Sequence, residues 1–379
     1  MAAPADPPRR VLAVKLADFG DALLTTPALA AMRAAWPSAR IDVLTTAHAA
    51  PIYRQSGLVD GVIAFAKADY DRPSGLAARP RALFALARTL RAGRYDRVAL
   101  FHPLTTRYGA LKHAALALTT GAPVRAGLAR PGAVRAWFLT HRAPDRGFAH
   151  AHVVEQMLAV AAAAGASPAG RRLVVRPGSA AAEVAAGLLR EVAPDRRLVL
   201  VHPGCGPFAP ARRWSADCFA AVCDALTADG HAVALVGTAG DGAAAVAAAC
   251  AHPPADLTDR TDLPTLAALL ARAALLVCND GGVMHLATAV GTPVVAVFGP
   301  SSATAWGPWW PAEDGPSPHQ VVTLDLPCQP CFYVGYRLGS PDGCPTRDCL
   351  RWLAAGPVVA AARRALAGGS ERTGATHDG

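Results

Sequence analysis

Acidic, basic and histidine side chains occur at three points of this sequence where an apolar run gives way to glycine. At the first point, Asp21 follows Gly20 shortly after the apolar run 11–16. Glycine permits a tight turn there, and a carboxylate beyond it can accept a proton from an attacking hydroxyl. Aspartate is also a common helix N-cap. Asp21 is therefore a candidate general base, with helix capping as the alternative.

The second point joins His202, Gly204 and Cys205 to the pair Arg212 and Arg213, a short loop later. Backbone N–H groups near a helix start, together with an arginine, form a natural site for phosphate. A surface arginine pair ahead of an amphipathic helix is the alternative. The pattern predicts a phosphate-binding loop.

The third point is Asp280, followed by Gly281 and Gly282 at the start of a predicted helix. The glycines let a ligand approach the backbone, and the helix N-terminus favours a diphosphate. His285 lies one turn into this helix. It either faces the ligand or is a structural histidine that packs against the sheet.

These points must be positioned by strands and helices that alternate along the chain. Strands are predicted at 11–16, 41–44, 62–65, 98–101, 173–175, 198–201, 233–236, 275–278 and 294–298. Helices are predicted from 22 to 36, at 81–91, 105–118 and 151–164, from 215, and at 241–250 and 283–290. Within the first of them, Thr26 is either a cap before Pro27 or the site of a kink. Such alternation is typical of parallel α/β sheets.

The second half of the chain repeats the plan of the first. We therefore predict an α/β protein with two Rossmann-like doubly wound domains, over 9–178 and 179–367, and ligands bound between the carboxyl ends of their strands. The polar, glycine-rich tail 368–379 is expected to be disordered.

The composition and charge of the chain indicate which kinds of partner it can bind. The chain has 379 residues, 52% of them hydrophobic, and a net charge of +9, which suits anionic partners such as a nucleoside diphosphate, a phosphorylated lipid or a membrane surface. The arginines are dispersed and form no nucleic-acid motif, so we expect no nucleic acid as partner. No apolar run is long enough to span a bilayer, and we expect a soluble, cytoplasmic protein.

Four of the nine cysteines are close together, with the spacing Cys-x2-Cys, twelve residues, and Cys-x4-Cys: Cys328, Cys331, Cys344 and Cys349. Four thiolates at such spacing can bind zinc or iron tetrahedrally, in a structural role. Free thiols in a loop-rich region are the alternative. The other five cysteines lie in apolar contexts and are expected to be small buried residues.

Together the three points resemble glycosyltransferase family 9, the ADP-heptose:lipopolysaccharide heptosyltransferase family, over about residues 10 to 353. The resemblance is carried, in this order, by Gly20-Asp21 with Thr26-Pro27, His202-Pro203-Gly204 with Arg213-Trp214, Asp280-Gly281-Gly282 with Met284-His285, and Phe298-Gly299-Pro300.

The resemblance implies a GT-B fold, with an N-terminal acceptor domain and a C-terminal donor domain that includes the cysteine-rich segment 328–349. It implies inverting transfer of heptose from ADP-heptose to a lipopolysaccharide inner-core or lipid-linked acceptor, at the inner face of the cytoplasmic membrane and without a cofactor for the chemistry. Asp21 matches the general base, and Arg212 matches the cation that neutralises the leaving group. The donor-binding positions are Gly20, Gly204, Cys205, Arg213, Asp241, Asp280, Gly281, Gly282 and His285.

Three departures from the family pattern leave the substrates open. Gly281 stands where many members have Ser or Thr, Cys205 begins an unusual proline-rich loop, and Phe101-His102-Pro103 replaces a polar stretch near the acceptor site. Another nucleotide sugar, a protein acceptor, a nucleotide-sugar epimerase and a non-catalytic nucleotide-sugar-binding scaffold are the alternatives.

Overall fold

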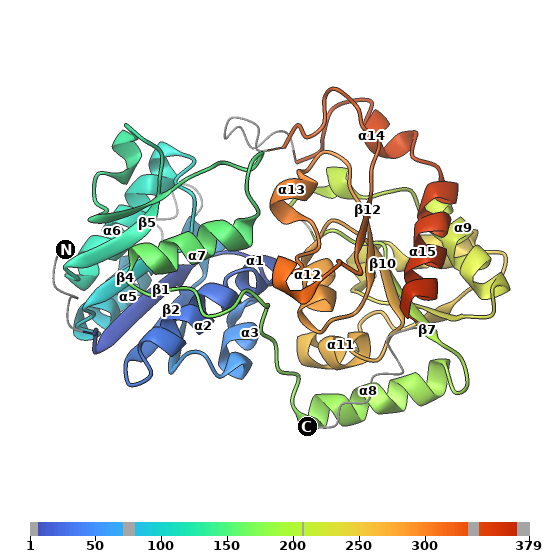
Figure 1. Cartoon of the computed structure of the whole chain (residues 1–379), viewed down its shortest axis with the longest axis horizontal. Helices are drawn as coiled ribbons and strands as arrows, with labels where there is room; N and C mark the ends of the chain where they lie inside the picture. Colours follow the sequence, from blue (N-terminus) through green and yellow to red (C-terminus); the bar gives the residue numbers. More distant parts are fainter. Residues whose placement is uncertain (1–6, 71–79, 207, 333–340, 370–379) are drawn as a thin grey trace. The chain divides into compact units, whose positions relative to one another are not determined.

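The computed structural model describes residues 7–70, 80–206, 208–332 and 341–369. The chain divides into two compact units (Figure 1). Unit 1 comprises Met1–Gly147 and Ala151–Val174, and unit 2 comprises Phe148–His150 and Val175–Gly379.

Unit 1 is built on a six-stranded parallel sheet in the order β3-β2-β1-β4-β5-β6. Its strands are β1 (Arg10–Lys15), β2 (Arg40–Thr45), β3 (Gly61–Ala64), β4 (Arg97–Leu100), β5 (Val124–Ala129) and β6 (His141–Pro144). The central strands β1, β2 and β4 are almost entirely buried, which explains their continuous apolar runs, because a sheet covered on both faces has no polar side.

Helices cover both faces of this sheet. The described helices of unit 1 are α1 (Phe19–Leu23), α2 (Thr26–Ala35), α3 (Ala50–Ser56), α5 (Pro80–Ala92), α6 (Arg107–Thr120) and α7 (Val153–Ala163), with the short 3-10 turns η1 (Lys67–Tyr70) and η2 (Val134–Ala136). α5 packs against α6, and α6 packs against η2, whereas α7 packs against α2 (Figure 1).

Unit 2 repeats the topology with the order β12-β11-β10-β7-β8-β9, again parallel. Its strands are β7 (Leu198–His202), β8 (Ala232–Leu235), β9 (Ala255–Asp256), β10 (Leu275–Asn279), β11 (Val294–Val297) and β12 (Gln320–Val322). In both sheets the first strand lies next to the fourth, so the order reverses between them. This is the strand order of dinucleotide-binding Rossmann folds, which bind ligands at the reversal point.

The described helices of unit 2 are α8 (Ser179–Val192), α9 (Ala216–Ala228), α10 (Ala243–Ala249), α11 (Leu263–Leu270), α12 (Gly282–Ala289), α13 (Ala303–Trp306), α14 (Asp348–Arg351) and α15 (Ala355–Gly369), with the 3-10 turns η3 (Pro210–Arg212), η4 (Ala239–Asp241) and η5 (Ala312–Asp314). α15 packs on α9 and on the strands β10 to β12, and α8 packs on α11 (Figure 1). The core between α9, α15 and the sheet is apolar and buried.

Three local predictions are corrected by the structure. Residues 173–175 form no strand; the Val174 N–H instead donates to the Thr26 hydroxyl at 2.9 Å. Thr26 is consequently not the cap of α2, whose N-cap is Thr25. Residues 179–192, for which the sequence analysis predicted no element, form the helix α8. Of the predicted disordered tail, Gly368 and Gly369 belong to α15 and the rest lies outside the described residues.

Candidate active site

The first cluster lies where β1 ends, at the strand-order reversal of unit 1. Lys15 is the last residue of β1, and its Nζ donates to Asp21 Oδ1 at 3.0 Å. The Lys15 side chain is only 3% exposed, whereas that of Asp21 is 39% exposed. The pair therefore presents a carboxylate to solvent over a buried ammonium.

Asp21 does not cap α1. The N-cap is Asp18, and Asp21 lies in the first turn of the helix. The tight turn expected at Gly20 is also not formed, because Gly20 is a buried helical residue of α1 and is not among the positive-φ glycines of the described chain.

Two histidines, the half-buried His102 and the buried His113, border this cluster, and the sequence analysis did not assign them a role. His102 follows β4; its Nε2 lies 3.3 Å from the Leu16 carbonyl, and its ring centroid lies 4.8 Å from that of His113. Burial, the neighbouring His113 and the charge of Lys15 hold the pKa of His102 well below its usual value. Burial also lowers the pKa of His113 to about 4. Both imidazoles are thus neutral at physiological pH. The motif Phe101-His102-Pro103 directly after a strand was the available signal.

The second cluster lies at the reversal point of unit 2, where β7 and β10 run side by side. Asp280 follows β10 and is 3% exposed. Its Oδ2 accepts a hydrogen bond from the Ser301 hydroxyl at 2.5 Å and lies 3.4 Å from Arg212 Nη1. Arg212 is tied back to the loop after β7, because its Nη2 donates to the Cys205 carbonyl at 2.7 Å. The structure thus joins two of the three predicted points.

Gly281 and Gly282 lie where a helix N-terminus meets this cluster. Gly281 is the N-cap of α12, without a side-chain cap, and Gly282 is the first helical residue. A Cβ on Gly281 would lie 3.4 Å from Cys205 Cα, an ordinary van der Waals contact. The first turn of α12 therefore carries unsatisfied N–H groups of the kind that bind anions.

His285 lies one turn into α12 and is 4% exposed. Its carbonyl accepts the Thr288 hydroxyl at 2.9 Å. Such burial agrees with a packed histidine, and its donor contact remains a prediction.

Asp241 lies against the loop after β7, next to His202 and Gly204. Its Oδ2 accepts both the N–H and the hydroxyl of Thr238 at 2.8 Å, which completes a capping box at the start of η4. His202 Nε2 lies 3.6 Å from the same oxygen. Burial raises the pKa of Asp241, but the contacts with His202 and Thr238 outweigh it and leave this pKa well below the usual value. Asp241 is thus ionised, and a local structural role accounts for its position.

Gly204 is required beneath this carboxylate. A Cβ there would lie 2.0 Å from Asp241 Oδ1 and 2.6 Å from Asp241 Cβ. Arg213 donates from Nη2 to the Gly240 carbonyl at 2.7 Å and lies 3.9 Å from Asp241 Oδ1. Cys205 is buried, and burial raises its thiol pKa, so it is no nucleophile.

The sequence analysis also missed Asn279, a fully buried residue that joins the loops of the second cluster. Its side-chain oxygen accepts the Trp214 N–H at 3.1 Å, and its Nδ2 donates to the Pro203 carbonyl at 2.6 Å. Its position directly before Asp280 was the only signal.

The four clustered cysteines lie in one neighbourhood. Burial, together with the charges of Cys331, Cys344 and Cys328, raises the pKa of Cys349 to about 11. Cys344 is exposed, and the Arg347 N–H, which donates to its Sγ at 3.2 Å, lowers its pKa. Among the described residues, however, no group of three or more ligand side chains is arranged to hold a metal ion. Of the other five, Cys205, Cys223 and Cys278 are buried, and Cys218 and Cys250 are half-buried.

The cysteine-rich segment is attached to the second cluster. The Pro300 carbonyl accepts the N–H groups of Cys331 and Phe332, each at 2.9 Å, next to Ser301. The Pro341 carbonyl accepts the Ala211 N–H at 3.1 Å, next to Arg212. This segment therefore braces both loops that deliver partners to Asp280.

Comparison with solved structures identifies the fold. The ADP-heptose lipopolysaccharide heptosyltransferase II of Escherichia coli superimposes with a TM-score of 0.71 at 22% identity, covering 95% of this chain and 99% of that one. The iron-containing dodecameric glycosyltransferase TibC of enterotoxigenic E. coli H10407 gives a TM-score of 0.56 at 14% identity, covering 97% and 78%. The fold is the GT-B fold of glycosyltransferases.

The profile of glycosyltransferase family 9 (heptosyltransferase) matches residues 83–339. The chain belongs to this family and is a glycosyltransferase. It is 28% identical to lipopolysaccharide heptosyltransferase 3 of E. coli K12 over 300 residues, which are 76% of this chain and 82% of that protein. In the described part of the chain, every helix is too short or too polar to cross a bilayer.

Proposed function

We propose that this enzyme transfers a heptose from ADP-heptose to a lipopolysaccharide inner-core acceptor, with inversion at the anomeric carbon. The family supports the reaction class, and the names of its relatives support the donor and the acceptor. The main support for donor binding in unit 2 is the Arg212–Asp280–Ser301 cluster. It lies beside the N-terminus of α12, at the reversal point of a Rossmann sheet.

In the proposed reaction the acceptor hydroxyl attacks the anomeric carbon and gives its proton to Asp21. The bond from that carbon to the diphosphate oxygen breaks, and its electron pair leaves with ADP. Arg212 and the first N–H groups of α12 stabilise the new charge. Asp280 and Ser301 hold Arg212 in place, and Gly281, Gly282 and His285 line the donor, with Gly204, Cys205, Arg213 and Asp241 forming the wall toward the ribose.

Lys15 supports the assignment of Asp21. A buried ammonium 3.0 Å from the carboxylate fixes its orientation. A half-exposed, oriented carboxylate can reach the hydroxyl whose proton a general base accepts.

The test compares Asp21→Asn with Asp18→Asn. Asp18 lies three residues away and is exposed, and its side chain makes no capping hydrogen bond. We expect Asp21→Asn to lower kcat by about 10²- to 10⁴-fold with unchanged ADP affinity, and Asp18→Asn to leave kcat unchanged. If the parent binds ADP but releases no ADP from ADP-heptose with acceptor present, the scaffold alternative is correct. If Asp21→Asn turns over normally, another group is the base.

The donor is tested by thermal shift with ADP, ADP-heptose and UDP-sugars. Ligands that bind the native state stabilise it by an amount that increases with affinity. We expect ADP-heptose to raise the Tm of the parent more than ADP or a UDP-sugar does. In Arg212→Ala the shift with ADP-heptose should be smaller than in the parent. A larger shift with a UDP-sugar would favour the alternative of another nucleotide sugar.

We also propose that Cys328, Cys331, Cys344 and Cys349 hold a structural zinc or iron ion. Thiolates are suitable ligands for both metals, burial and the neighbouring thiols raise the pKa of Cys331 and of Cys349, and the segment that carries them braces the loops of Pro300 and Ala211. The bound metal would fix those loops. Elemental analysis of the purified full chain tests this: one ion per chain that is lost in Cys328→Ser/Cys331→Ser supports it, and a metal-free active enzyme refutes it.

We place the enzyme in the cytoplasm, at the inner face of the membrane that carries its acceptor. The family relatives named for lipopolysaccharide support this placement. Fractionation of cells that express the tagged full chain tests it.

A further inference from the structure

One stretch of unit 1 is strongly basic. Between Pro80 and Pro144 the sequence has eleven lysines and arginines and a single acid, Asp96. Asp96 is occupied, because its Oδ2 accepts the backbone N–H groups of Arg9 and Arg10 at 2.7 and 2.8 Å. The stretch forms the strands β4, β5 and β6 as well as α5, α6 and η2, and six of the eleven cations lie on α5, α6 and η2. α5 packs against α6, and α6 packs against η2.

Large apolar side chains are exposed on the same three elements. Phe84 of α5 is 72% exposed, Leu111 and Leu118 of α6 are 60% and 42% exposed, and Val134 of η2 is 83% exposed. Trp137, directly after η2, is 56% exposed. Leu111 and Leu118 lie seven residues apart and so share one side of α6. Exposed apolar groups gathered in this way mark an interaction surface.

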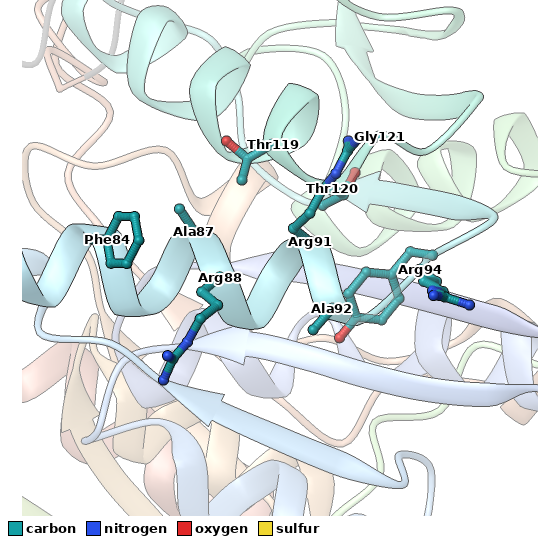
Figure 2. Close-up of a pocket in the computed structure, with 10 residues that line it drawn as sticks. Phe84, Ala87, Arg88, Arg91, Ala92, Arg94, Thr119, Thr120 and Gly121 are labelled. Carbon is teal, nitrogen blue, oxygen red and sulfur yellow. The ribbon is translucent and has the colours of Figure 1, made fainter.

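The basic and apolar residues meet in a groove of about 920 Å³ along α5 (Figure 2). Phe84 lines it near one end, Arg88 and Arg91 follow along α5, and Arg94 lies just beyond the end of that helix. Thr119 and Thr120 at the end of α6 complete the wall. In an adjoining groove the carboxylate of Asp42 is 4% exposed and accepts the Tyr95 hydroxyl at 2.9 Å, so it adds no exposed negative charge.

This groove is separate from the candidate active site. It lies at the C-terminal ends of α5 and α6, which lead into the amino ends of β4 and β5. Asp21 lies beyond the carboxyl end of β1, which is parallel to β4. The two features therefore belong to opposite edges of one sheet.

We propose that α5, α6 and η2 form the surface by which the enzyme docks on an anionic lipid bilayer. Arginines attract the anionic headgroups, exposed apolar side chains enter the interface, and the groove of Arg88, Arg91 and Arg94 receives a headgroup phosphate. Nucleic acid also binds arginines, but the sequence has no nucleic-acid-binding motif, whereas a bilayer interface takes up both cations and exposed apolar side chains. The inference deepens the proposed function, since an enzyme with a lipid-anchored acceptor must reach the lipid surface.

The test is co-sedimentation of the full chain with phosphatidylcholine vesicles, with and without phosphatidylglycerol, in the absence of donor and acceptor. We expect binding only to the anionic vesicles, and weaker binding at high salt. Each arginine at such a surface contributes about a 5-fold factor, so Arg81→Glu/Arg88→Glu should lower partitioning by at least about 25-fold. Phe84→Ser should lower it by roughly 10-fold.

Matched controls lie on unit 2. Arg190→Glu/Arg196→Glu changes the net charge equally at two exposed positions, and Val184→Ser removes an apolar side chain that is 53% exposed. These variants should bind vesicles as the parent does.

Loss of binding in the controls as well, or no vesicle binding by the parent, overturns the proposal. If inorganic phosphate prevents the protein from binding anionic vesicles, the groove is a site for free phosphate instead of a lipid headgroup. Turnover with a delipidated, soluble acceptor should be unchanged in all variants, which separates this outcome from failure of the proposed reaction.

Discussion

Gly204→Ala should destabilise unit 2 by about 1–3 kcal/mol, because its methyl group has no room. The new Cβ would lie 2.0 Å from Oδ1, 2.3 Å from Cγ and 2.6 Å from Cβ of Asp241. Rotation of the Asp241 side chain relieves only the first two contacts, since Cβ is fixed to the backbone. The capping box with Thr238 must therefore shift, and its hydrogen bonds at 2.8 Å must weaken.

Thermal melting of the purified full chain measures the effect. For a unit of about 200 residues, 1–3 kcal/mol corresponds to roughly 2–12 °C in Tm. Gly281→Ala is the matched control, because its Cβ would lie 3.4 Å from Cys205 Cα and should shift Tm little. Asp241→Ala should also destabilise the protein, through loss of the capping box. In Gly204→Ala/Asp241→Ala the clash with Cγ and Oδ1 is absent, so the double variant should lose less than the sum of the single variants. Equal melting of Gly204→Ala and the parent, or strict additivity, would refute the steric account.

Three further predictions concern the charged groups. Lys15→Met keeps the buried volume but removes the 3.0 Å ion pair, so kcat should fall by up to about 100-fold with the KM for donor unchanged; a changed KM alone would contradict the positioning role. The pKa of His113 is about 4 in the folded protein, below its value of about 6.5 in the unfolded chain. Neutral His113 therefore contributes about 3 kcal/mol to the free energy of unfolding above pH 6.5, and this contribution is lost as the pH falls toward 4. Denaturant titrations should show that His113→Asn loses less stability than the parent as the pH is lowered. In protein treated with a chelator to remove bound metal, iodoacetamide near neutral pH should alkylate Cys344, whose pKa is lowered, before Cys349, whose pKa is about 11, as mass spectrometry can show; equal rates would contradict the order.

The fold was predictable wherever a strand is buried on both faces. β1, β7 and β10 appear in the sequence as unbroken apolar runs, because helices cover both sides of each sheet. β6 was missed because only one of its four residues is buried. β5 was missed because Arg125 interrupts it, although the Arg125 guanidinium donates to the Phe138 and Ala122 carbonyls.

The site was predictable in its residues but not in its pairings. Asp280 and Arg212 were found separately, yet their contact joins residues 68 positions apart and depends on β7 lying beside β10. The Lys15–Asp21 pair needs a helix to begin at Phe19 and bring its first turn back over the strand end. The capping role of Asp241 could have been found from Thr238, three residues earlier, since this spacing is that of a capping box.

Each unit has an ion pair at the strand-order reversal of its sheet, and the two pairs bury opposite charges. At the end of β1 the cation Lys15 is buried at 3% exposure under a carboxylate that is 39% exposed. After β10 the carboxylate of Asp280 is buried at 5% exposure, beside an Arg212 side chain that is 18% exposed. Burial of one partner of an ion pair fixes the other partner and leaves it to act on a ligand. In the proposed reaction unit 1 supplies the base and unit 2 supplies the cation, which is the division of roles that transfer from a diphosphate donor to a hydroxyl acceptor requires. Reversal of either pair, as in Lys15→Asp/Asp21→Lys, should abolish turnover even if the ion pair itself is kept.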